Sequence, residues 1–254
     1  MCYGPTARPP APPILGGAGV ATSGRLTLEA ADGNRPMAFS ATTSDPDAPG
    51  IVILPDVRGL HPFFEELAIR FAEVGVHATV FDYFGRTAGA GERGEGFDHR
   101  PHVARTTTEG IRLDAAAAFA HLASDEGGGA ARIFSVGFCM GGRQSFNLAA
   151  SDIAVAGVIG FYGFPARDDA EDTEAPTALA QGYRAPVLGV FGGADRSISV
   201  SDVSAFRDAL DRAGVVNEIV TYDGAPHSFF DRKSADFAAA CDDAWGRILR
   251  FVGR

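Results

Sequence analysis

One short stretch, residues 132–150 (RIFSVGFCMGGRQSFNLAA), constrains the fold more than any other part of the chain. An apolar β-type run leads into Gly-Phe-Cys-Met-Gly-Gly, and a helical pattern follows. This strand–turn–helix layout presents a nucleophile on a sharp turn, and the glycines around the cysteine leave room for that turn. The positive end of the following helix would face the sulfur and favour a thiolate. Cys139 is therefore a candidate catalytic nucleophile.

Strand-like and helix-like segments alternate from residue 51 onward. This alternation predicts an α/β fold with a mostly parallel central sheet and helices on both of its faces. Two alternating runs that flank a turn, 25–30 and 37–42, predict an antiparallel N-terminal hairpin. The continuous β-branched run 51–54 is typical of a strand buried on both faces. The remaining elements are expected as strands at 77–82, 133–138, 153–162, 186–191 and 217–222, and as helices at 63–74, 108–124, 202–213 and 234–252.

Composition separates a short N-terminal segment from the rest of the chain. Residues 1–22 are rich in Pro, Gly and Ala, show no hydrophobic period and predict an extended arm. Residues 23–254 predict one domain with a sizeable core. Within it, the Gly-rich stretch 83–107 is the longest irregular segment, and loops of this length are usually functional or mobile, so it is a candidate lid. The acidic run 168–174 predicts a solvated loop.

Charge and cysteine usage restrict the partners. With 22 Lys and Arg against 32 Asp and Glu, the net charge is −10, which argues against nucleic acid or an anionic membrane surface. The cysteines, Cys2, Cys139 and Cys241, form no C-x-x-C pair, which disfavours disulfides and zinc and suits a reducing compartment. Because neither a signal peptide nor a membrane-spanning run is visible, we expect a cytoplasmic protein. His99 and His102 lack a further ligand pair, and no nucleotide motif is present, so we expect no metal or cofactor.

Two more side chains follow predicted strands and complete a possible catalytic set. Asp195 lies in FGGADRSI and His227 in DGAPHSFF, each just past a buried strand. Functional side chains in parallel α/β sheets lie at the carboxyl ends of strands, so Cys139, Asp195 and His227 are expected at one edge. A thiol needs a base near neutral pH, and the base needs an acceptor that fixes its tautomer. The alternatives are that Asp195 caps the next helix and that His227 only hydrogen-bonds within its loop.

The stretches GFCMGG, GGADRSI and PHSFFDR, with IVILPDVRG upstream, resemble those of the dienelactone hydrolase (carboxymethylenebutenolidase) family. The similarity runs from about residue 25 to the C-terminus. The cysteine-centred turn is its most specific part, because most α/β hydrolases have serine there. The resemblance implies that residues 23–254 form a single α/β-hydrolase domain that opens an enol lactone through an acyl-enzyme.

The resemblance also implies roles for individual residues. Cys139 would be the nucleophile, His227 the base and Asp195 the residue that orients the base. The developing oxyanion would be bound by the backbone N–H groups of Met140 and Val57, the latter just after the strand 51–54.

The residues that would bind the substrate depart from the family pattern. Where members often carry a glutamate that activates the thiol, this chain has Asp56, which is one methylene shorter. The arginine expected four positions after the histidine is replaced by Asp231, and Arg232 follows one position later. Tyr162 matches an aromatic position of the family. Three further arginines are candidate clamps for a substrate carboxylate: Arg58, Arg105 and Arg143.

The chemistry of a sulfur nucleophile restricts the substrate. A thiolate leaves more readily than an alkoxide, so the tetrahedral intermediate collapses backward unless the substrate has a good leaving group of its own. Enol lactones, aryl esters and thioesters meet this condition, and simple amides do so poorly. The sequence therefore predicts a hydrolase for a small lactone or activated ester. A general carboxylesterase or thioesterase of the same fold, and a catalytically silent hydrolase-fold binding protein, are the alternatives.

Overall fold

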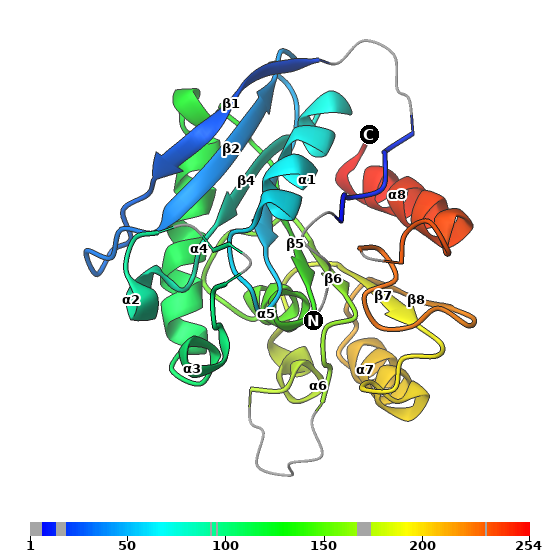
Figure 1. Cartoon of the computed structure of the whole chain (residues 1–254). Coiled ribbons are helices and arrows are strands. Elements are labelled where there is room, and N and C mark those ends of the chain that lie inside the picture. Colours follow the sequence, from blue (N-terminus) through cyan, green and yellow to red (C-terminus); the bar gives the residue numbers. More distant parts are fainter. Residues whose placement is uncertain (1–6, 14–18, 92, 95, 167–173, 232) are drawn as a thin grey trace.

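The computed structural model describes residues 7–13, 19–91, 93–94, 96–166, 174–231 and 233–254. Within these residues, eight strands form one sheet in the order β1-β2-β4-β3-β5-β6-β7-β8 (Figure 1). The pairs β1–β2 and β2–β4 are antiparallel, and every pair from β4 to β8 is parallel. The predicted mostly parallel sheet with an antiparallel N-terminal hairpin is confirmed. The strands are β1 (Val20–Thr27), β2 (Met37–Thr43), β3 (Gly50–Leu54), β4 (His77–Phe81), β5 (Ile133–Phe138), β6 (Val158–Phe161), β7 (Val187–Gly192) and β8 (Asn217–Tyr222).

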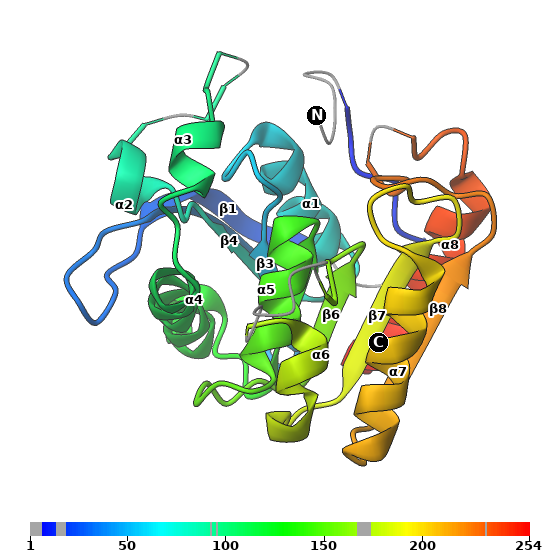
Figure 2. The same ribbon diagram turned by 90° about the horizontal axis from the view of Figure 1, so that it is seen from below.

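Helices cover both faces of the sheet (Figures 1 and 2), as predicted. Helices α1 and α8 lie on one face, and α4, α5, α6 and α7 lie on the other. Because both faces are covered, every residue of β3 to β7 is buried, and these strands are mostly apolar. The helices are α1 (Pro62–Glu73), α2 (Gly85–Ala88), α3 (Arg100–Val103), α4 (Thr108–Ala123), α5 (Met140–Leu148), α6 (Pro176–Leu179), α7 (Val200–Arg212) and α8 (Ala238–Val252), with 3-10 turns at Asp125–Gly127 and Ala180–Gly182.

Side-chain caps define where three of the long helices begin. Thr107 accepts a hydrogen bond from the N–H of Gly110 at 3.1 Å at the start of α4, and Ser199 accepts one from Asp202 at 3.0 Å at the start of α7. His61 caps α1 in the same way, with Pro62 at the first helical position. Such caps satisfy N–H groups that have no partner inside the helix. Helix α5 differs, because Cys139 precedes it and makes no capping bond.

Several element boundaries differ from the prediction. Strand β1 begins at Val20 instead of residue 25, so its first residues belong to the segment predicted as an arm. Strand β6 begins at Val158 instead of residue 153, because the chain bends at Ile153 and Ala156 and the Val155 N–H bonds locally to the Ile153 carbonyl at 2.8 Å. Helix α8 begins at Ala238 instead of residue 234. The irregular stretch 83–107 contains the short helices α2 and α3.

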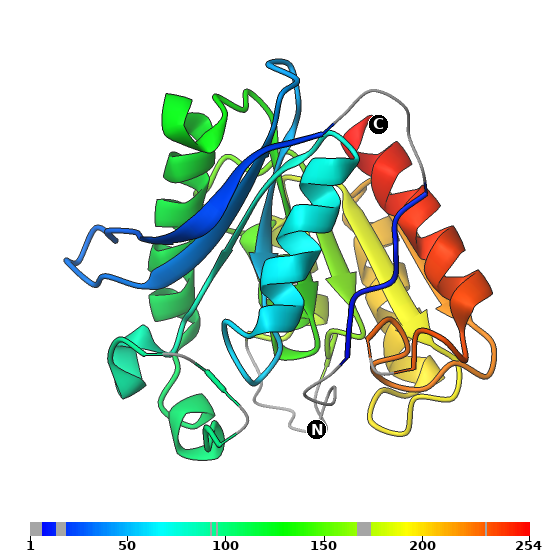
Figure 3. The same ribbon diagram turned by 45° about the horizontal axis from the view of Figure 1, so that its top comes forward.

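Residues 7–13 of the predicted arm cross the surface beside α1 and α8 (Figure 3). The indole Nε1–H of Trp245 on α8 donates to the Pro10 carbonyl at 3.1 Å. On the other side, the guanidinium of Arg8 lies 2.6 Å from the carboxylate of Glu66 on α1. Pro9, between these two contacts, is buried. This part of the arm therefore contacts both helices on that face of the sheet, α1 and α8.

Candidate active site

The nucleophile candidate lies on a strained turn between β5 and α5. Cys139 has φ 55° and ψ −114°, a backbone conformation that L-residues rarely adopt. Its side chain is largely buried, with 8 % of its surface exposed. Strain of this kind costs about 1–3 kcal/mol and persists only where the surroundings enforce it, typically at functional sites. The conformation is the one expected for a nucleophile held at the start of a helix.

Close backbone packing enforces this turn. A Cβ atom added to Gly137 would lie 1.9 Å from the carbonyl oxygen of Gly141, and one added to Gly141 would lie 2.2 Å from the carbonyl oxygens of Leu54 and Pro55. No side chain fits at either position without moving the backbone. The two glycines therefore let α5 start directly against β5 and against the end of β3.

The register of the sheet brings the loop after β3 to the nucleophile. Leu54, the last residue of β3, pairs with Gly137 of β5. The chain beyond Leu54 therefore runs beside the chain beyond Gly137, and Val57, Cys139 and Met140 line one cavity. In the described part of the chain, no hydrogen bond uses the backbone N–H of Val57 or of Met140. Both predicted oxyanion donors thus have N–H groups without a hydrogen-bond acceptor among the described residues, in the same cavity wall as Cys139.

His227 and Asp195 meet at the same edge from two later loops. The Nδ1 atom of His227 lies 2.7 Å from Oδ2 of Asp195, whose side chain is 1 % exposed. The other oxygen of Asp195 accepts the N–H groups of Ser197 at 2.8 Å and Ile198 at 3.3 Å. The carboxylate is therefore fixed by its own turn and presents one oxygen to the imidazole. It does not cap α7, because Ser199 does so.

The environment of His227 favours its charged form. Burial lowers the pKa of His227, but hydrogen bonds with Asp195 and with Cys139, and the charges of both residues, outweigh burial and raise it to about 10. An imidazolium beside the sulfur in turn favours the thiolate. Aromatic rings confine the imidazole: Tyr162 lies 4.9 Å and Phe164 lies 5.9 Å from it, centroid to centroid.

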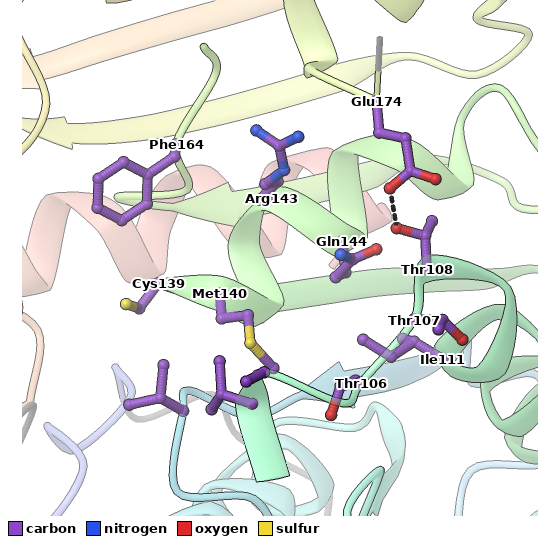
Figure 4. Close-up of a pocket in the computed structure, with 13 residues that line it drawn as sticks. Thr106, Thr107, Thr108, Ile111, Cys139, Met140, Arg143, Gln144, Phe164 and Glu174 are labelled. Atoms are coloured by element: carbon purple, nitrogen blue, oxygen red, sulfur yellow. Dashed lines mark hydrogen bonds between the residues drawn. The ribbon is translucent and has the colours of Figure 1, made fainter. Parts of the chain in front are cut away.

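A cavity of about 590 Å³ opens beside Cys139 (Figure 4). Helix α5 contributes Arg143 and Gln144, which lie about one turn beyond the nucleophile. Glu174 accepts a hydrogen bond from the Thr108 hydroxyl at 2.6 Å and so joins the segment before α6 to the start of α4. Among the described residues that line the cavity, Arg143 is the only one with a positively charged side chain, and Glu174 is the only one with a carboxylate. The other lining residues are Val57, Val103, Ala104, Thr106, Thr107, Ile111, Cys139, Met140 and Phe164.

Three further sequence candidates, Asp56, Arg58 and Arg105, are not among the residues that line this cavity. Asp56 is buried and accepts the N–H of Arg58 at 2.9 Å. Neither Asp56 nor Arg58 is among the lining residues. Arg105 donates to the Thr87 and Pro101 carbonyls, both at 3.1 Å, within its own loop. The structure therefore does not bring Arg58 or Arg105 to the cavity wall.

The last two sequence candidates are Tyr162, directly after β6, and Arg232, in the loop after β8. The hydroxyl of Tyr162 donates to Asp231 at 3.4 Å, and Asp231 is buried. Asp231, which replaces the expected arginine, is therefore directed into the protein interior, toward the Tyr162 hydroxyl. Arg232 lies outside the described residues.

Sequence reasoning missed nine of the thirteen residues that line the cavity, among them Gln144, Phe164, Thr108 and Glu174. Gln144 could have been found from helical spacing, since it lies four positions after Met140 and therefore on the same face of α5. Phe164 follows β6 at the carboxyl edge, where the strand-end rule places functional side chains. Thr108 and Glu174 carried no local signal, because their contact joins segments far apart in the chain.

The described residues contain no group of three or more His, Cys, Asp or Glu side chains that is arranged to hold a metal ion. Among the helices that the structure describes, none has both the length and the apolar character needed to cross a membrane.

Comparison with known proteins identifies the family. A model of the dienelactone hydrolase family matches residues 37–254. A Salmonella typhimurium protein named "Putative carboxymethylenebutenolidase" is 28% identical over 99% of this chain and 95% of its own length. The carboxymethylenebutenolidase of Rhodococcus opacus is 27% identical over 100% of this chain and 97% of its own.

A solved structure agrees with these sequence matches. The crystal structure of a Klebsiella pneumoniae protein described as "Putative Dienelactone Hydrolase" matches with a TM-score of 0.79 and 26% identity, covering 92% of this chain and 98% of that one. The family model, the relatives and the solved structure thus all indicate the same family. The chain belongs to the dienelactone hydrolase family of α/β hydrolases and is a hydrolase that acts on carboxylic esters.

Proposed function

We propose that this protein opens a lactone or cleaves an activated ester through a Cys139-His227-Asp195 triad and a thioester acyl-enzyme. One observation carries the proposal: His227 hydrogen-bonds Asp195 through Nδ1 at 2.7 Å and also hydrogen-bonds Cys139, which faces the 590 Å³ cavity. A nucleophile, a base and a residue that orients the base are therefore linked by consecutive hydrogen bonds. This is the arrangement that activates a weak nucleophile.

In the first half of the reaction, the Cys139 thiolate attacks the carbonyl carbon of the ester. The carbonyl oxygen becomes an oxyanion and accepts the N–H groups of Val57 and Met140. When the intermediate collapses, the carbon–oxygen bond of the leaving group breaks. The His227 imidazolium gives its proton to that oxygen, which leaves the acyl group as a thioester on Cys139.

In the second half, water attacks the thioester. Neutral His227 takes a proton from the water as its oxygen bonds to the acyl carbon. The second tetrahedral intermediate uses the same two N–H donors. Its collapse expels the Cys139 thiolate, releases the acid and restores the imidazolium–thiolate pair.

The cavity supports a substrate that carries a polar or anionic group on its acyl side. Arg143 carries the positive charge among the described lining residues. It lies about one helical turn from Cys139, roughly 6 Å along the helix axis. A guanidinium binds a carboxylate through two parallel hydrogen bonds. The name of the Rhodococcus opacus relative specifies a lactone with a carboxymethylene substituent. We therefore propose a carboxylated enol lactone as the substrate class, with Arg143 as its carboxylate partner.

The decisive experiment is replacement of Cys139 by Ala, combined with mass spectrometry of the wild-type protein during turnover. We expect loss of p-nitrophenyl acetate and dienelactone hydrolysis in the variant, and an acyl adduct on the Cys139 peptide of the wild type. Hydrolysis at the wild-type rate by Cys139→Ala contradicts the nucleophile assignment. A panel of lactones, aryl esters and thioesters separates the proposal from a general carboxylesterase or thioesterase, and no turnover at all points to a silent binding protein.

A further inference from the structure

The end of β4 supports the loop that carries one oxyanion donor. Tyr83, two residues after the last residue of β4, is 1 % exposed. Its hydroxyl donates a hydrogen bond shared between the carbonyl oxygens of Pro55, at 2.7 Å, and Asp56. These two carbonyls lie in the chain between β3 and Val57. A buried phenol from another strand end therefore contacts the backbone of the oxyanion loop, residues 55–60.

The contact with Asp56 bears directly on the donor. The carbonyl of Asp56 and the N–H of Val57 belong to one planar trans peptide, so the two bonds point in opposite directions. When the carbonyl is held toward Tyr83, the Val57 N–H is held away from it, toward the cavity that Val57 lines. The N–H of Gly59 also bonds to the Asp56 oxygen, at 3.1 Å. Hydrogen bonds at the carbonyl polarise the whole peptide and strengthen its N–H as a donor.

A neighbouring side chain fixes the far end of the same loop. Asp82, next to Tyr83, accepts the N–H of Leu60 at 3.5 Å, and its other oxygen is held by Arg93 at 2.7 Å. Gly59 has φ +75°, and a Cβ added there would lie 2.5 Å from the Asp82 carboxylate, so only glycine permits this approach. Tyr83 and Asp82 thus hold the oxyanion loop at both of its ends.

We propose that Tyr83 is a positioning residue for the hydrolytic reaction. It sets the plane of the Asp56–Val57 peptide so that the Val57 N–H faces the oxygen on which negative charge develops. Tyr83 itself does not touch the substrate and is not among the lining residues. The proposal rests on the proposed function, because it requires an oxyanion at this site.

The test compares Tyr83→Phe with Tyr183→Phe. Removing the Tyr83 hydroxyl keeps the ring and its contacts with Phe81 and Phe84. Tyr183 is a matched control, because its hydroxyl is also buried but has no hydrogen-bond partner among the described residues. Rates are expressed per activated Cys139, counted by brief alkylation at about pH 6.5, where the ordinary thiols of an unfolded fraction react little.

For Tyr83→Phe we expect kcat/KM to fall about tenfold through kcat, with KM little changed, less than the loss from deleting an oxyanion donor outright. The affinity for an aldehyde inhibitor, which forms a thiohemiacetal on Cys139, should fall by a similar factor. The alkylation rate of Cys139 should stay at the wild-type value, since no oxyanion forms in that reaction. Tyr183→Phe should leave all three quantities unchanged.

A merely structural role for Tyr83 would lower the unfolding midpoint without this selective loss. As a second variant, p-aminophenylalanine at position 83 keeps a donor of similar reach and should restore most of the lost kcat and aldehyde affinity. Wild-type kcat and aldehyde affinity in Tyr83→Phe overturn the proposal, as does the absence of rescue by the amino analogue. Failure of the proposed function is a different result, namely activity that survives in Cys139→Ala.

Discussion

Nδ1 of His227 lies 2.7 Å from Oδ2 of Asp195, an almost fully buried carboxylate whose other oxygen is occupied by two backbone N–H groups of its own turn. Asp195 therefore has one oxygen directed at the imidazole, and His227 must carry its Nδ1 proton to meet it. The opposite nitrogen, Nε2, is left to serve Cys139. In the proposed mechanism, this pair would set the tautomer of His227 and direct proton transfer through the other ring nitrogen.

Asp195→Asn keeps the shape of the side chain and an oxygen for the Ser197 and Ile198 amides, so the turn should survive. The amide can no longer stabilise an imidazolium, and it favours the wrong tautomer of His227. We expect kcat/KM for p-nitrophenyl acetate to fall on the order of ten-thousandfold with an unchanged unfolding midpoint, because loss of an orienting carboxylate has an effect of this size in a serine triad. Steady-state kinetics and urea unfolding measure the two quantities. Activity within threefold of the wild type would refute the role of Asp195.

Alkylation by iodoacetamide should report the state of the Cys139–His227 pair. The pKa of His227 is raised to about 10, so its charge and the stability it contributes are fully present below about pH 6.5 and are lost as the pH rises through 10. Between pH 7 and 9 the rate at Cys139 should therefore change less than about twofold. An ordinary thiol gains roughly 25-fold over this range.

Cys241 is the internal control for this measurement. Burial, with the nearby carboxylates of Asp242 and Asp231, raises the pKa of its thiol to about 12. Peptide mapping of the alkylated protein should find label at Cys139 and none at Cys241 while the protein is folded. A rate at Cys139 that climbs steeply from pH 7 to 9 would contradict the ion pair.

Arg143→Gln should change substrate preference more than catalysis. If Arg143 binds a substrate carboxylate, KM for a carboxylated lactone should rise about tenfold or more, the size of a lost charged hydrogen bond. The rate with a neutral ester such as p-nitrophenyl acetate should change less than twofold, and measuring both on one sample removes any effect of stability. Arg58→Gln is the matched control, since Arg58 does not line the cavity. Equal losses on both substrates would contradict the assignment.

The buried pair Arg93–Asp82 should be important for stability. Both side chains are at most 4 % exposed, and they meet at 2.7 Å. Arg93→Met leaves the Asp82 carboxylate buried without its cation, which should lower the free energy of unfolding by about 3 kcal/mol. Arg100→Met breaks an exposed pair with Asp98 in the same loop and should leave the unfolding midpoint unchanged. Urea unfolding of the two variants checks the difference, and equal midpoints would contradict it.

The sequence predicts the sheet and the meeting of Cys139, Asp195 and His227 because each of these residues follows an apolar strand. In a parallel sheet all such strand ends lie at one edge, so positions far apart in sequence can be brought together by topology alone. Strand starts are less predictable. The run from residue 153 is as apolar as β6 itself, and only the pairing of Val158 with Ser135 decides where the strand begins.

Residues that depend on packing could not be predicted. Glu174 belongs to an acidic run that predicts a solvated loop, yet it reaches Thr108 and lines the cavity. Tyr83 begins a stretch without periodicity, and its contact with Pro55 depends on how two strand ends pack. By charge alone Arg105 is a candidate carboxylate clamp, but its guanidinium donates to the Pro101 and Thr87 carbonyls of its own loop. The sequence shows that an arginine is charged, but it does not show toward which part of the protein its side chain points.

The order of the three strand-end loops also has a consequence during synthesis on the ribosome. Cys139 is made 88 residues before His227, and between the two the chain must add β6, β7 and β8. At about 5–20 residues per second, the sulfur spends roughly 4–18 seconds without the base that the proposed mechanism requires. On the proposed mechanism, a growing chain carries Cys139 as a thiol that is not yet activated. Activation by His227 would follow once the last strand has joined the sheet, so that full reactivity of Cys139 would mark a completed fold.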